Sequence, residues 1–405
     1  MKLTRLQRQV DKERIPDNLV NSFPCQLVPS SYIFINLNIN KMKKKNYFAL
    51  CALLMASTLV GCSKDDAENN PQPEQPGQTV LNGYYVLNSG KMGSNNSTIT
   101  FYNTESKETT SDIFETANGR KLGDTANDMI IYGSKIYLAV YGSQTIEVTD
   151  LNGKSLKQIK SSTDKPLQPR AFTSYGGKVY VSLFDGYVAS IDTTSLEIDN
   201  TVAVGRNPEQ LTVANGKLYV ANSGGLDYNT EVGYDKTVSV VNLESFTETK
   251  KIETVLNPCN VQRDSQEDVY LVSMGNYADV PNTLQKINTS TDEISTVSVA
   301  NATEMASLGD KIFMMYSQYD ENWNQTITYY MYDAINENII TDSALKETIA
   351  KPYKIAADKA SNMLFVTESD YTNNGDVYCF DGDGNLKVKF EAGLNPIKVI
   401  ASSVQ

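Results

Sequence analysis

The chain has 405 residues, a formal charge of −12 at pH 7 and no histidine. The lack of histidine excludes a Ser-His-Asp triad, an imidazole general base and a histidine-ligated zinc or haem site. The acidic balance makes nucleic acid a poor partner, because an anionic surface repels phosphate backbones. These exclusions favour binding over catalysis, so we expect a protein that is not an enzyme and has no cofactor.

Residues 42–67 contain the three regions of a secretory signal. Lysines at positions 43–45 precede an apolar stretch over residues 47–60, which is too short to span a bilayer. The stretch ends in Leu-Val-Gly-Cys, which resembles the bacterial lipobox, where small residues precede a cysteine that carries the lipid. We therefore expect residues 42–61 to be a cleaved lipoprotein signal peptide and Cys62 to be the lipidated first residue of the mature protein.

The segments on either side of this signal support the same interpretation. Residues 63–66 (Ser-Lys-Asp-Asp) resemble the tag that sends Bacteroidetes lipoproteins to the cell exterior. We expect residues 62–80 to be the lipidated cysteine and a Pro/Gln-rich, disordered tether. Residues 1–41 precede the expected natural start at Met42, so we interpret them as a non-native upstream extension. We expect a lipid-anchored protein on the outer face of the outer membrane, held to the membrane by its lipid alone.

The mature protein is expected to be more acidic than the whole chain. Removing residues 1–61 takes away nine Lys/Arg and three acidic residues, so the formal charge moves from −12 to −18. Of the five cysteines, only Cys259 and Cys379 lie downstream of Cys62, which is too few for a disulfide scaffold. We expect both to be small core residues.

From residue 81 to 405 the chain repeats one pattern. Its clearest copy begins at Pro208, turns at Asn215-Gly216, and continues through apolar segments around Tyr219 and at residues 238–241 and 247–252. Asn-Gly supplies the positive backbone angles of a two-residue hairpin, so each copy predicts four strands. Six full copies carry an aromatic residue in the second strand: Tyr137, Tyr180, Tyr219, Tyr270, Phe313 and Phe365. Their spacing, roughly 40–50 residues, is the period of a propeller blade.

The two ends of the repeating region supply a seventh copy. The N-terminal copy begins at its second strand, residues 84–87, and the missing first strand occurs at residues 396–401. Sharing one blade between the ends removes exposed sheet edges. The sequence therefore predicts an all-β, seven-bladed β-propeller with four-stranded blades over residues 81–405, closed by the C-terminal strand joining the N-terminal blade.

The propeller prediction also locates a candidate binding face. The residues that begin each first strand surround the axis, and the loops after each second strand surround that ring. Two positions of each copy form the predicted ring: Asn127, Arg170, Glu209, Cys259, Thr303, Tyr353 and Ile397, followed by Asp128, Ala171, Gln210, Asn260, Glu304, Lys354 and Lys398. The loops carry Tyr141, Phe184, Tyr228, Tyr234, Tyr277, Tyr319, Trp323 and Tyr371.

An aromatic rim around a polar ring suits a large ligand that has a flat apolar surface and amide edges. We predict a ligand-binding site made of Asn127, Arg170, Phe184, Glu209, Tyr228, Tyr277, Tyr319, Trp323, Tyr353 and Tyr371. The alternative for any single loop aromatic is that it packs over a neighbouring blade without touching a ligand.

Metal binding is the weaker alternative on this face. Asp128, Glu209 and Glu304 offer oxygen ligands for a hard cation, as in propeller lactonases, but three basic residues share the ring. At residues 381–385 the sequence Asp-Gly-Asp-Gly-Asn has the alternating oxygens of a calcium loop. Leu386 and Ala392 then stand where that loop requires Gly and Glu, so a hairpin turn is favoured and we expect no metal.

The pattern Pro-x-x-[apolar] followed by Gly-Lys-[apolar]-Tyr-[Val/Leu], present at residues 169–181 and 208–220, resembles the YncE-like propeller family over nearly all of residues 81–405. With the lipobox and the export tag, the chain resembles the BtuG-type surface lipoproteins of Bacteroidetes. This resemblance implies capture of cobalamin (vitamin B12) or another corrinoid and delivery to a BtuB-type TonB-dependent outer-membrane transporter. The alternative is a propeller lipoprotein that binds a glycan or a protein partner in another nutrient-uptake system.

Overall fold

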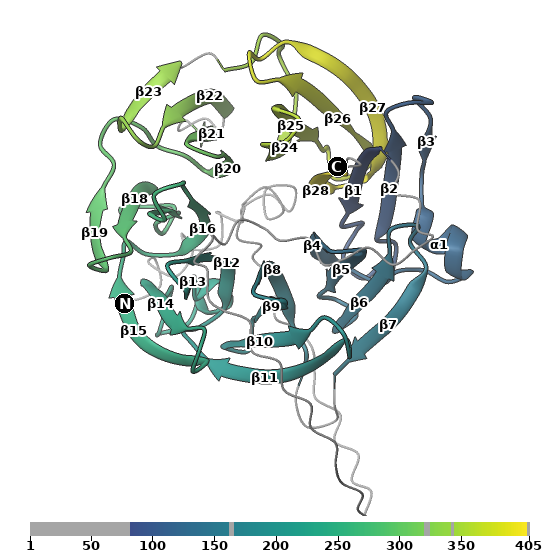
Figure 1. Ribbon diagram of the computed structural model, residues 1–405. Helices are drawn as coiled ribbons and strands as arrows, with labels where there is room; N and C mark the ends of the chain where they lie inside the picture. The colour runs from purple at the N-terminus through teal and green to yellow at the C-terminus, as the bar shows by residue number, and fades with distance from the viewer. Residues whose placement is uncertain (1–81, 162–165, 320–324, 342–343, 403–405) are drawn as a thin grey trace, which may run out of the picture. The chain divides into compact units, whose positions relative to one another are not determined.

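The computed structural model describes residues 82–161, 166–319, 325–341 and 344–402. Over these residues, seven four-stranded antiparallel sheets are arranged as blades around a central axis (Figure 1). The predicted all-β, seven-bladed propeller is therefore confirmed. The expected upstream extension, signal peptide, lipidation site Cys62 and tether lie outside the described residues.

Each blade runs from an inner strand beside the axis to an outer strand at the circumference. The first three complete blades are β4 (Ala126–Tyr132), β5 (Lys135–Val140), β6 (Thr145–Asp150) and β7 (Ser155–Lys160); β8 (Pro169–Tyr175), β9 (Lys178–Leu183), β10 (Tyr187–Asp192) and β11 (Glu197–Ala203); and β12 (Pro208–Ala214), β13 (Lys217–Asn222), β14 (Thr237–Asn242) and β15 (Thr247–Glu253). Turns with glycine or asparagine in the left-handed region, such as Asn215-Gly216, join the first two strands.

The next three blades follow the same order. They are β16 (Pro258–Arg263), β17 (Val269–Ser273), β18 (Thr283–Asn288) and β19 (Glu293–Thr296); β20 (Glu304–Leu308), β21 (Lys311–Tyr319), β22 (Gln325–Asp333) and β23 (Asn338–Thr341); and β24 (Pro352–Asp358), β25 (Met363–Glu368), β26 (Asn374–Asp381) and β27 (Leu386–Leu394). A short 3₁₀ helix, η1 (Gly225–Asp227), lies in the loop between β13 and β14.

The seventh blade joins the two ends of the repeating region. β28 (Pro396–Ser402) pairs antiparallel with β1 (Gly83–Asn88), which continues to β2 (Thr98–Asn103) and β3 (Thr109–Thr110). The predicted closure of the ring is confirmed. β3 has only two residues, and helix α1 (Ile113–Asn118) follows it and packs Phe114 into the core.

The sequence prediction did not include this helix. Asp112 caps it by accepting hydrogen bonds from the backbone N–H groups of Phe114 and Glu115, and Gly119 ends it at a φ of 64°. None of the described residues belongs to a helix with the length and apolar character needed to cross a membrane.

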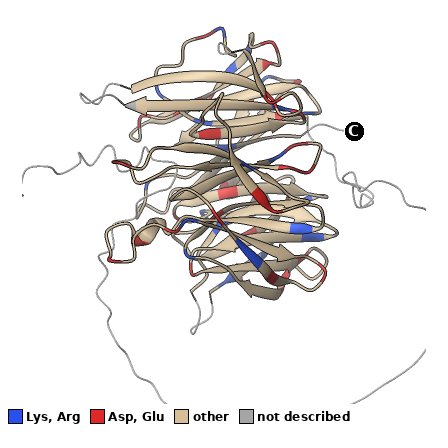
Figure 2. Ribbon diagram, turned by 90° about the vertical axis from the view of Figure 1, so that its left-hand side faces the viewer, with Lys and Arg blue, Asp and Glu red and all other residues tan. Residues whose placement is uncertain are grey.

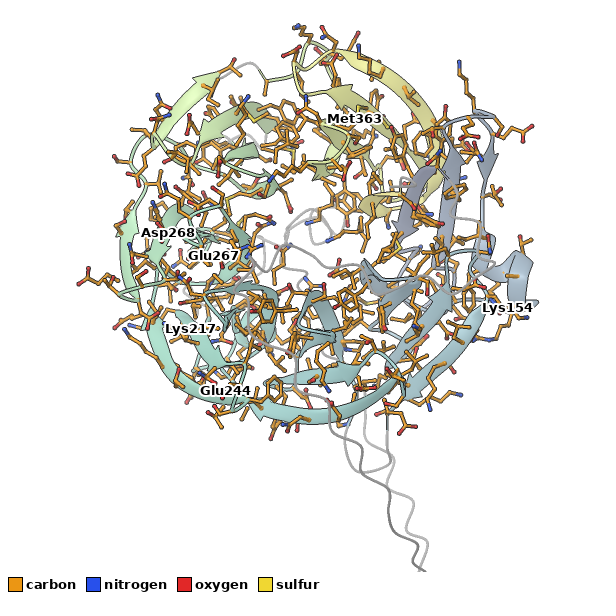
Figure 3. All side chains as sticks on the ribbon, viewed as in Figure 1. Lys154, Lys217, Glu244, Glu267, Asp268 and Met363 are labelled. Atoms are coloured by element: carbon orange, nitrogen blue, oxygen red, sulfur yellow. The ribbon has the colours of Figure 1, made fainter. Side chains whose placement is uncertain are left out.

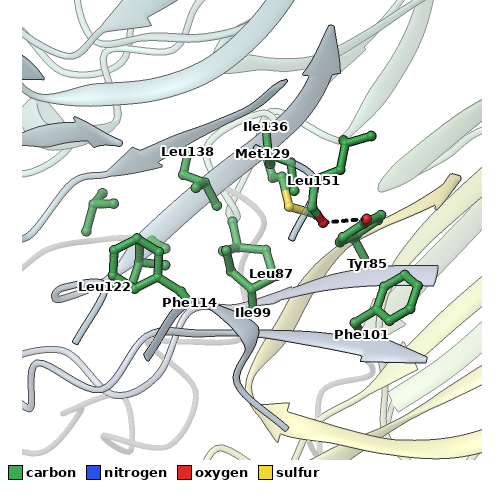
Figure 4. Packing of buried hydrophobic residues seen from close by; sticks show 12 residues of the cluster. Tyr85, Leu87, Ile99, Phe101, Phe114, Leu122, Met129, Ile136, Leu138 and Leu151 are labelled. Carbon is green, nitrogen blue, oxygen red and sulfur yellow. Dashed lines mark hydrogen bonds between the residues drawn. The ribbon is translucent and has the colours of Figure 1, made fainter. Parts of the chain in front are cut away.

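The repeated second-strand aromatic lies in the hydrophobic core between neighbouring blades. Tyr85 occupies this position in the closing blade, and the members from all seven blades are at most 5% exposed: Tyr85, Tyr137, Tyr180, Tyr219, Tyr270, Phe313 and Phe365. Several of the hydroxyls also bind the next blade around the ring. Tyr85 donates to the carbonyl of Leu151 at 2.7 Å (Figure 4), and Tyr270 donates to the carbonyl of Ala334 at 3.1 Å. The aromatic repeat thus packs each blade against its neighbour and, at some positions, also hydrogen-bonds to it.

Both downstream cysteines are buried, Cys259 at 5% exposed and Cys379 at 0%. Cys379 is a free thiol within an apolar cluster, and burial raises its pKa. Cys259 lies in the apolar cluster between the β16–β19 and β20–β23 blades. Cys379 is therefore a buried core residue as expected, whereas Cys259 is buried but disulfide-bonded, which the sequence did not predict.

Charged residues connect neighbouring blades away from the axis. Figure 2 shows acidic and basic residues interspersed along the blades on the side drawn. Lys217 pairs with Asp292 at 3.1 Å, and Lys286 pairs with Asp268 at 3.0 Å; Lys217 and Asp268 are labelled in Figure 3. The Lys217–Asp292 pair joins the β12–β15 blade to the β16–β19 blade.

Candidate ligand-binding site

A cavity of about 320 Å³ lies on the axis, lined by the inner strands of the blades. All of the predicted ring positions line it except Thr303. The reason is geometric: each inner strand begins at the same end of the axis, so its first side chains meet those of its neighbours. We call this end the mouth. The cavity continues toward the other end past Gln262, Ser307 and Asp358.

Six charged side chains form a balanced set at the mouth. Three ion pairs each join neighbouring blades: Asp128 with Lys398 at 3.0 Å, Arg170 with Glu209 at 2.5 Å, and Glu304 with Lys354. We call these residues the ion-pair belt. The three carboxylate residues are at most 7% exposed, so their attraction to the cations is weakly screened.

The belt explains why the mouth is a poor metal site. Each of its carboxylates already faces a basic side chain, and Asp128 also accepts a hydrogen bond from the backbone N–H of Phe172 at 2.8 Å. The described ranges contain no group of three or more His, Cys, Asp or Glu placed to hold a metal ion. In residues 381–385, Asp381 accepts hydrogen bonds from the backbone N–H groups of Asp383 and Asn385, which forms the turn between β26 and β27.

Arg170 is held from two sides. Its guanidinium lies 4.8 Å from the ring centroid of Phe184, while Glu209 accepts its Nε–H. Tyr141 packs edge-on against Phe184, with centroids 5.6 Å apart. The sequence predicted Phe184 on an exposed rim, but the side chain is only 4% exposed. Its buried ring packs against the guanidinium of Arg170.

A row of three tyrosines lies beside the mouth, and we call it the tyrosine ridge. Tyr234 contacts Tyr228 on one side and Tyr277 on the other, with ring centroids 6.4 Å apart in each pair. Tyr228 is 42% exposed and Tyr277 is 39% exposed. The ridge therefore offers a continuous aromatic surface to solvent.

Tyr277 connects the ridge to the cavity. Burial of its hydroxyl end raises its pKa, and Tyr234 and the belt residues Glu209 and Glu304 raise it further. The Tyr277 side chain is nevertheless 39% exposed, so its ring remains part of the surface of the ridge. Burial likewise raises the pKa of Tyr234, to about 12. Both hydroxyls stay neutral at physiological pH and can donate hydrogen bonds.

The loop that carries Tyr228 and Tyr234 is fixed by Arg206, a residue that the sequence reasoning missed. The Arg206 guanidinium donates to Asp227 at 2.5 Å and to the carbonyl of Gly233 at 2.9 Å. Gly224 adopts a φ of 61° where a Cβ would meet the backbone nitrogen of Asp235 at 2.2 Å. An arginine directly before the Asn-Pro that begins the β12 strand was the available signal.

A second aromatic pair lies across the mouth. Tyr353 lines the cavity and packs edge-on against Tyr371, with centroids 5.5 Å apart. Tyr371 has a φ of 62°, which is unusual for a bulky residue. Asp370 stabilises this turn by accepting from the backbone N–H groups of Asn373 and Thr372, and these bonds lower its pKa to about 2.

The remaining predicted site residues divide into two groups. Asn127 lines the cavity, and its Nδ2 is buried with no hydrogen-bond partner in the described part of the chain. Tyr319 is the last residue of β21, where its backbone pairs with Gln325, but its side chain lies outside what the structure describes. Trp323 also lies outside the described residues. The structure thus brings together Asn127, Arg170, Glu209, Tyr277 and Tyr353 at one mouth.

The fold and this mouth define a β-propeller with a ligand-sized polar cavity on its axis and aromatic side chains around one opening. Residues 82–308 match the family model described as "Domain of unknown function (DUF5074)". Since the match spans more than half of the sequence, the chain belongs to the DUF5074 family. No curated protein matches the chain in sequence.

Solved structures share the fold. Hydrazine synthase of Kuenenia stuttgartiensis matches with a TM-score of 0.54 at 14% identity, covering 67% of this chain and 88% of that one. A quinonprotein alcohol dehydrogenase-like protein from Bacteroides thetaiotaomicron matches with a TM-score of 0.52 at 18% identity, covering 80% of this chain and 78% of that one. At these identities the likeness is one of fold.

Proposed function

We propose that this protein is a cell-surface lipoprotein that captures a corrinoid at the mouth of its propeller and passes it to a BtuB-type TonB-dependent transporter. One observation carries the proposal: an exposed tyrosine ridge lies beside a polar cavity whose mouth carries three ion pairs. A site with both features favours a large neutral ligand that has an apolar face and polar edges.

A corrinoid has these properties. Its macrocycle offers a broad apolar face that can stack on Tyr228 and Tyr277, and its periphery carries amide groups. The ring side chains Asn127, Arg170 and Glu209 can exchange hydrogen bonds with amides. A corrinoid that keeps its own base on cobalt requires no imidazole from the protein, so a chain without histidine is compatible with this ligand.

The sequence features upstream of the propeller support the cellular part of the proposal. The lipobox ending at Cys62 and the acidic tag at residues 63–66 are typical of lipoproteins displayed on the cell exterior. A surface capture protein would release its ligand to a transporter in the same membrane, because a corrinoid is too large to diffuse through the outer membrane unaided.

A glycan is the second candidate, favoured by the same tyrosines, since flat aromatic surfaces also stack on sugar rings. A protein partner could instead bury the ridge. Both alternatives use the mouth but differ in ligand chemistry.

Isothermal titration calorimetry of the purified protein with cyanocobalamin tests the proposal. We expect saturable binding with one site, and pink protein after purification from cells supplied with the vitamin. The absence of both heat and any rise in melting temperature at excess ligand would reject corrinoid capture. Binding to an oligosaccharide panel in the same assay, without binding to cyanocobalamin, would favour the glycan.

A further inference from the structure

The axial cavity contains a buried acceptor that no group of the described residues uses. Asn260 is 4% exposed and lines the cavity, and its Oδ1 has no hydrogen-bond partner within the described ranges. Its Nδ2 donates to Glu304 at 3.4 Å. Since an ionised carboxylate only accepts, the amide nitrogen must face Glu304, and this fixes the oxygen as the group left without a donor. Buried polar atoms of this kind are normally satisfied, so the cavity is built to receive a donor.

A matching donor occurs on the β4–β7 blade. The Nδ2 of Asn127 lines the same cavity and is buried without an acceptor in the part of the chain that the structure describes. The cavity therefore offers one free acceptor and one free donor on different blades. A guest that both donates and accepts satisfies both.

The charge balance of the cavity determines the charge of that guest. The ion-pair belt contributes equal numbers of acidic and basic side chains, each bound to a partner on the next blade. The one further charged residue of the lining, Asp358, accepts hydrogen bonds from the backbone N–H and the hydroxyl of Ser361. Within the belt, an anion or a cation would have to break one of these ion pairs, and it would also be desolvated without compensation.

The volume limits the size of the guest. A cavity of about 320 Å³ corresponds to roughly ten water molecules at about 30 Å³ each. This space accommodates a short side chain of a ligand, whereas a large ring system must remain outside on the tyrosine ridge.

We infer that the axial cavity is a recognition pocket for a neutral primary carboxamide carried on a short alkyl arm, with its N–H donating to Asn260 and its carbonyl accepting from Asn127. This inference rests on the proposed function, since it assigns the amide periphery of the captured ligand to the cavity and the flat face to the ridge. The pocket would therefore distinguish an amide from a carboxylate at the same position on a ligand.

Methyl-detected NMR of the full chain tests this with small probes that do not depend on the corrinoid. Met305, Ile355 and Val399 line the cavity and report on its occupancy. Propionamide, propionate, n-propylammonium and propanol differ in charge and hydrogen bonding at nearly constant size. We expect saturable shifts of these methyls with propionamide on the order of millimolar, and weaker or no response to both ions.

Two variants separate recognition from general stability. Asn260→Ala removes the acceptor and should weaken propionamide binding by about fivefold, the effect of one neutral hydrogen bond. Asn200→Ala makes the same change at an exposed position on β11 and should leave binding unchanged. Melting temperatures of both variants check folding. The comparison of the four probes on the unaltered protein tests the inference even if a variant does not fold.

The outcomes distinguish this inference from the proposed function. An equal or stronger response to propionate or propylammonium, or no response to any probe, would overturn the carboxamide pocket, the latter result meaning that water alone fills the cavity. An equal response to propanol would show that the pocket accepts any neutral hydrogen-bond donor, and it would reject specific recognition of the amide. If propionamide binds while cyanocobalamin does not, the pocket stands and corrinoid capture falls; the reverse result has the opposite meaning.

Discussion

Two sets of repeat positions, those packed between neighbouring blades and those that line the axial cavity, differ in how much their residues vary from blade to blade. Between the blades, the second-strand position is an aromatic residue in every copy and is buried. At the mouth, the equivalent ring position is Asn, Arg, Glu, Cys, Thr, Tyr and Ile in successive blades. Packing between blades requires an aromatic side chain at the second-strand position, whereas the ring positions at the mouth accept polar, charged and apolar side chains.

The difference teaches where stability and function are separated in this molecule. The aromatic repeat lies between sheets, where burial of apolar area stabilises the ring. The ring positions lie at strand beginnings around an open axis, so their side chains can vary and form pairs that serve recognition. Substitutions in the two regions should therefore affect different properties.

The largest effect is expected in the packing between blades. Phe365 is 1% exposed and packs edge-on against Tyr84 at 5.0 Å between ring centroids. Phe365→Ala should lower the free energy of unfolding by about 3–5 kcal/mol, because it removes buried area and leaves a cavity. Urea unfolding followed by circular dichroism measures this. Leu156→Ala, at a residue 48% exposed, is the control and should change stability by less than about 0.5 kcal/mol.

The next effect is expected in the ion-pair belt. Arg170→Ala leaves the buried carboxylate of Glu209 without its cation and should lower the free energy of unfolding by about 3 kcal/mol. Adding Glu209→Ala should recover part of that loss, because the unpaired charge is then removed. A double variant as unstable as the sum of the single variants would contradict this coupling.

An exposed ion pair provides the comparison for the belt. Lys236 and Glu253 pair at 2.5 Å with side chains 54% and 74% exposed. The corresponding Lys236→Ala variant should show no measurable loss of stability, since solvent screens the pair.

A smaller effect, on ligand affinity, is expected at the tyrosine ridge. Tyr228→Ala should weaken cyanocobalamin binding by about tenfold through the loss of one stacking surface, with stability nearly unchanged. Tyr175→Ala is a matched control, since Tyr175 is 38% exposed but ends β8 at the opposite end from the mouth. Equal affinities of the two variants in calorimetry would remove the ridge from the binding site.

The smallest effect concerns a buried carboxylate that, unlike those of the belt, makes no ion pair with the described residues. Asp264 is 3% exposed; its Oδ1 accepts two backbone N–H bonds, while its Oδ2 has no partner among the residues described. Burial raises its pKa above the ordinary value. The folded protein therefore holds this proton more tightly than the unfolded chain, and wild-type stability falls as the pH rises through the two pKa values.

Asp264→Asn keeps the acceptor for the turn and removes the buried charge. The variant should be more stable than the wild type at pH 7, by less than about 1 kcal/mol, and the difference should close as the pH falls to about 4. Urea unfolding across this pH range measures it. Asp383→Asn, at an exposed turn residue, should leave the pH dependence unchanged, and a stability gap that widens on acidification would contradict the assignment.

Much of the site's location could be predicted because it follows from the fold. Ring positions such as Arg170, Glu209 and Tyr353 were placed at the axis from their position in the repeat, and they line the cavity. Their partners could not be predicted, because the pairing of Arg170 with Glu209 depends on the rotation between neighbouring blades. The burial of Phe184 beneath Arg170 had the same origin, since sequence does not tell which loop aromatic folds inward.

The sequence by itself determined the number of blades, the aromatic register and the closure of the ring by a strand at residues 396–401, because a period of strands and turns is a local property repeated along the chain. Only the tertiary structure decided the ion-pair belt, the role of Arg206 in holding the tyrosine ridge, and the unpartnered oxygen of Asn260. These features arise between residues 21 to 270 positions apart, whose distance and orientation are set when seven blades pack around one axis.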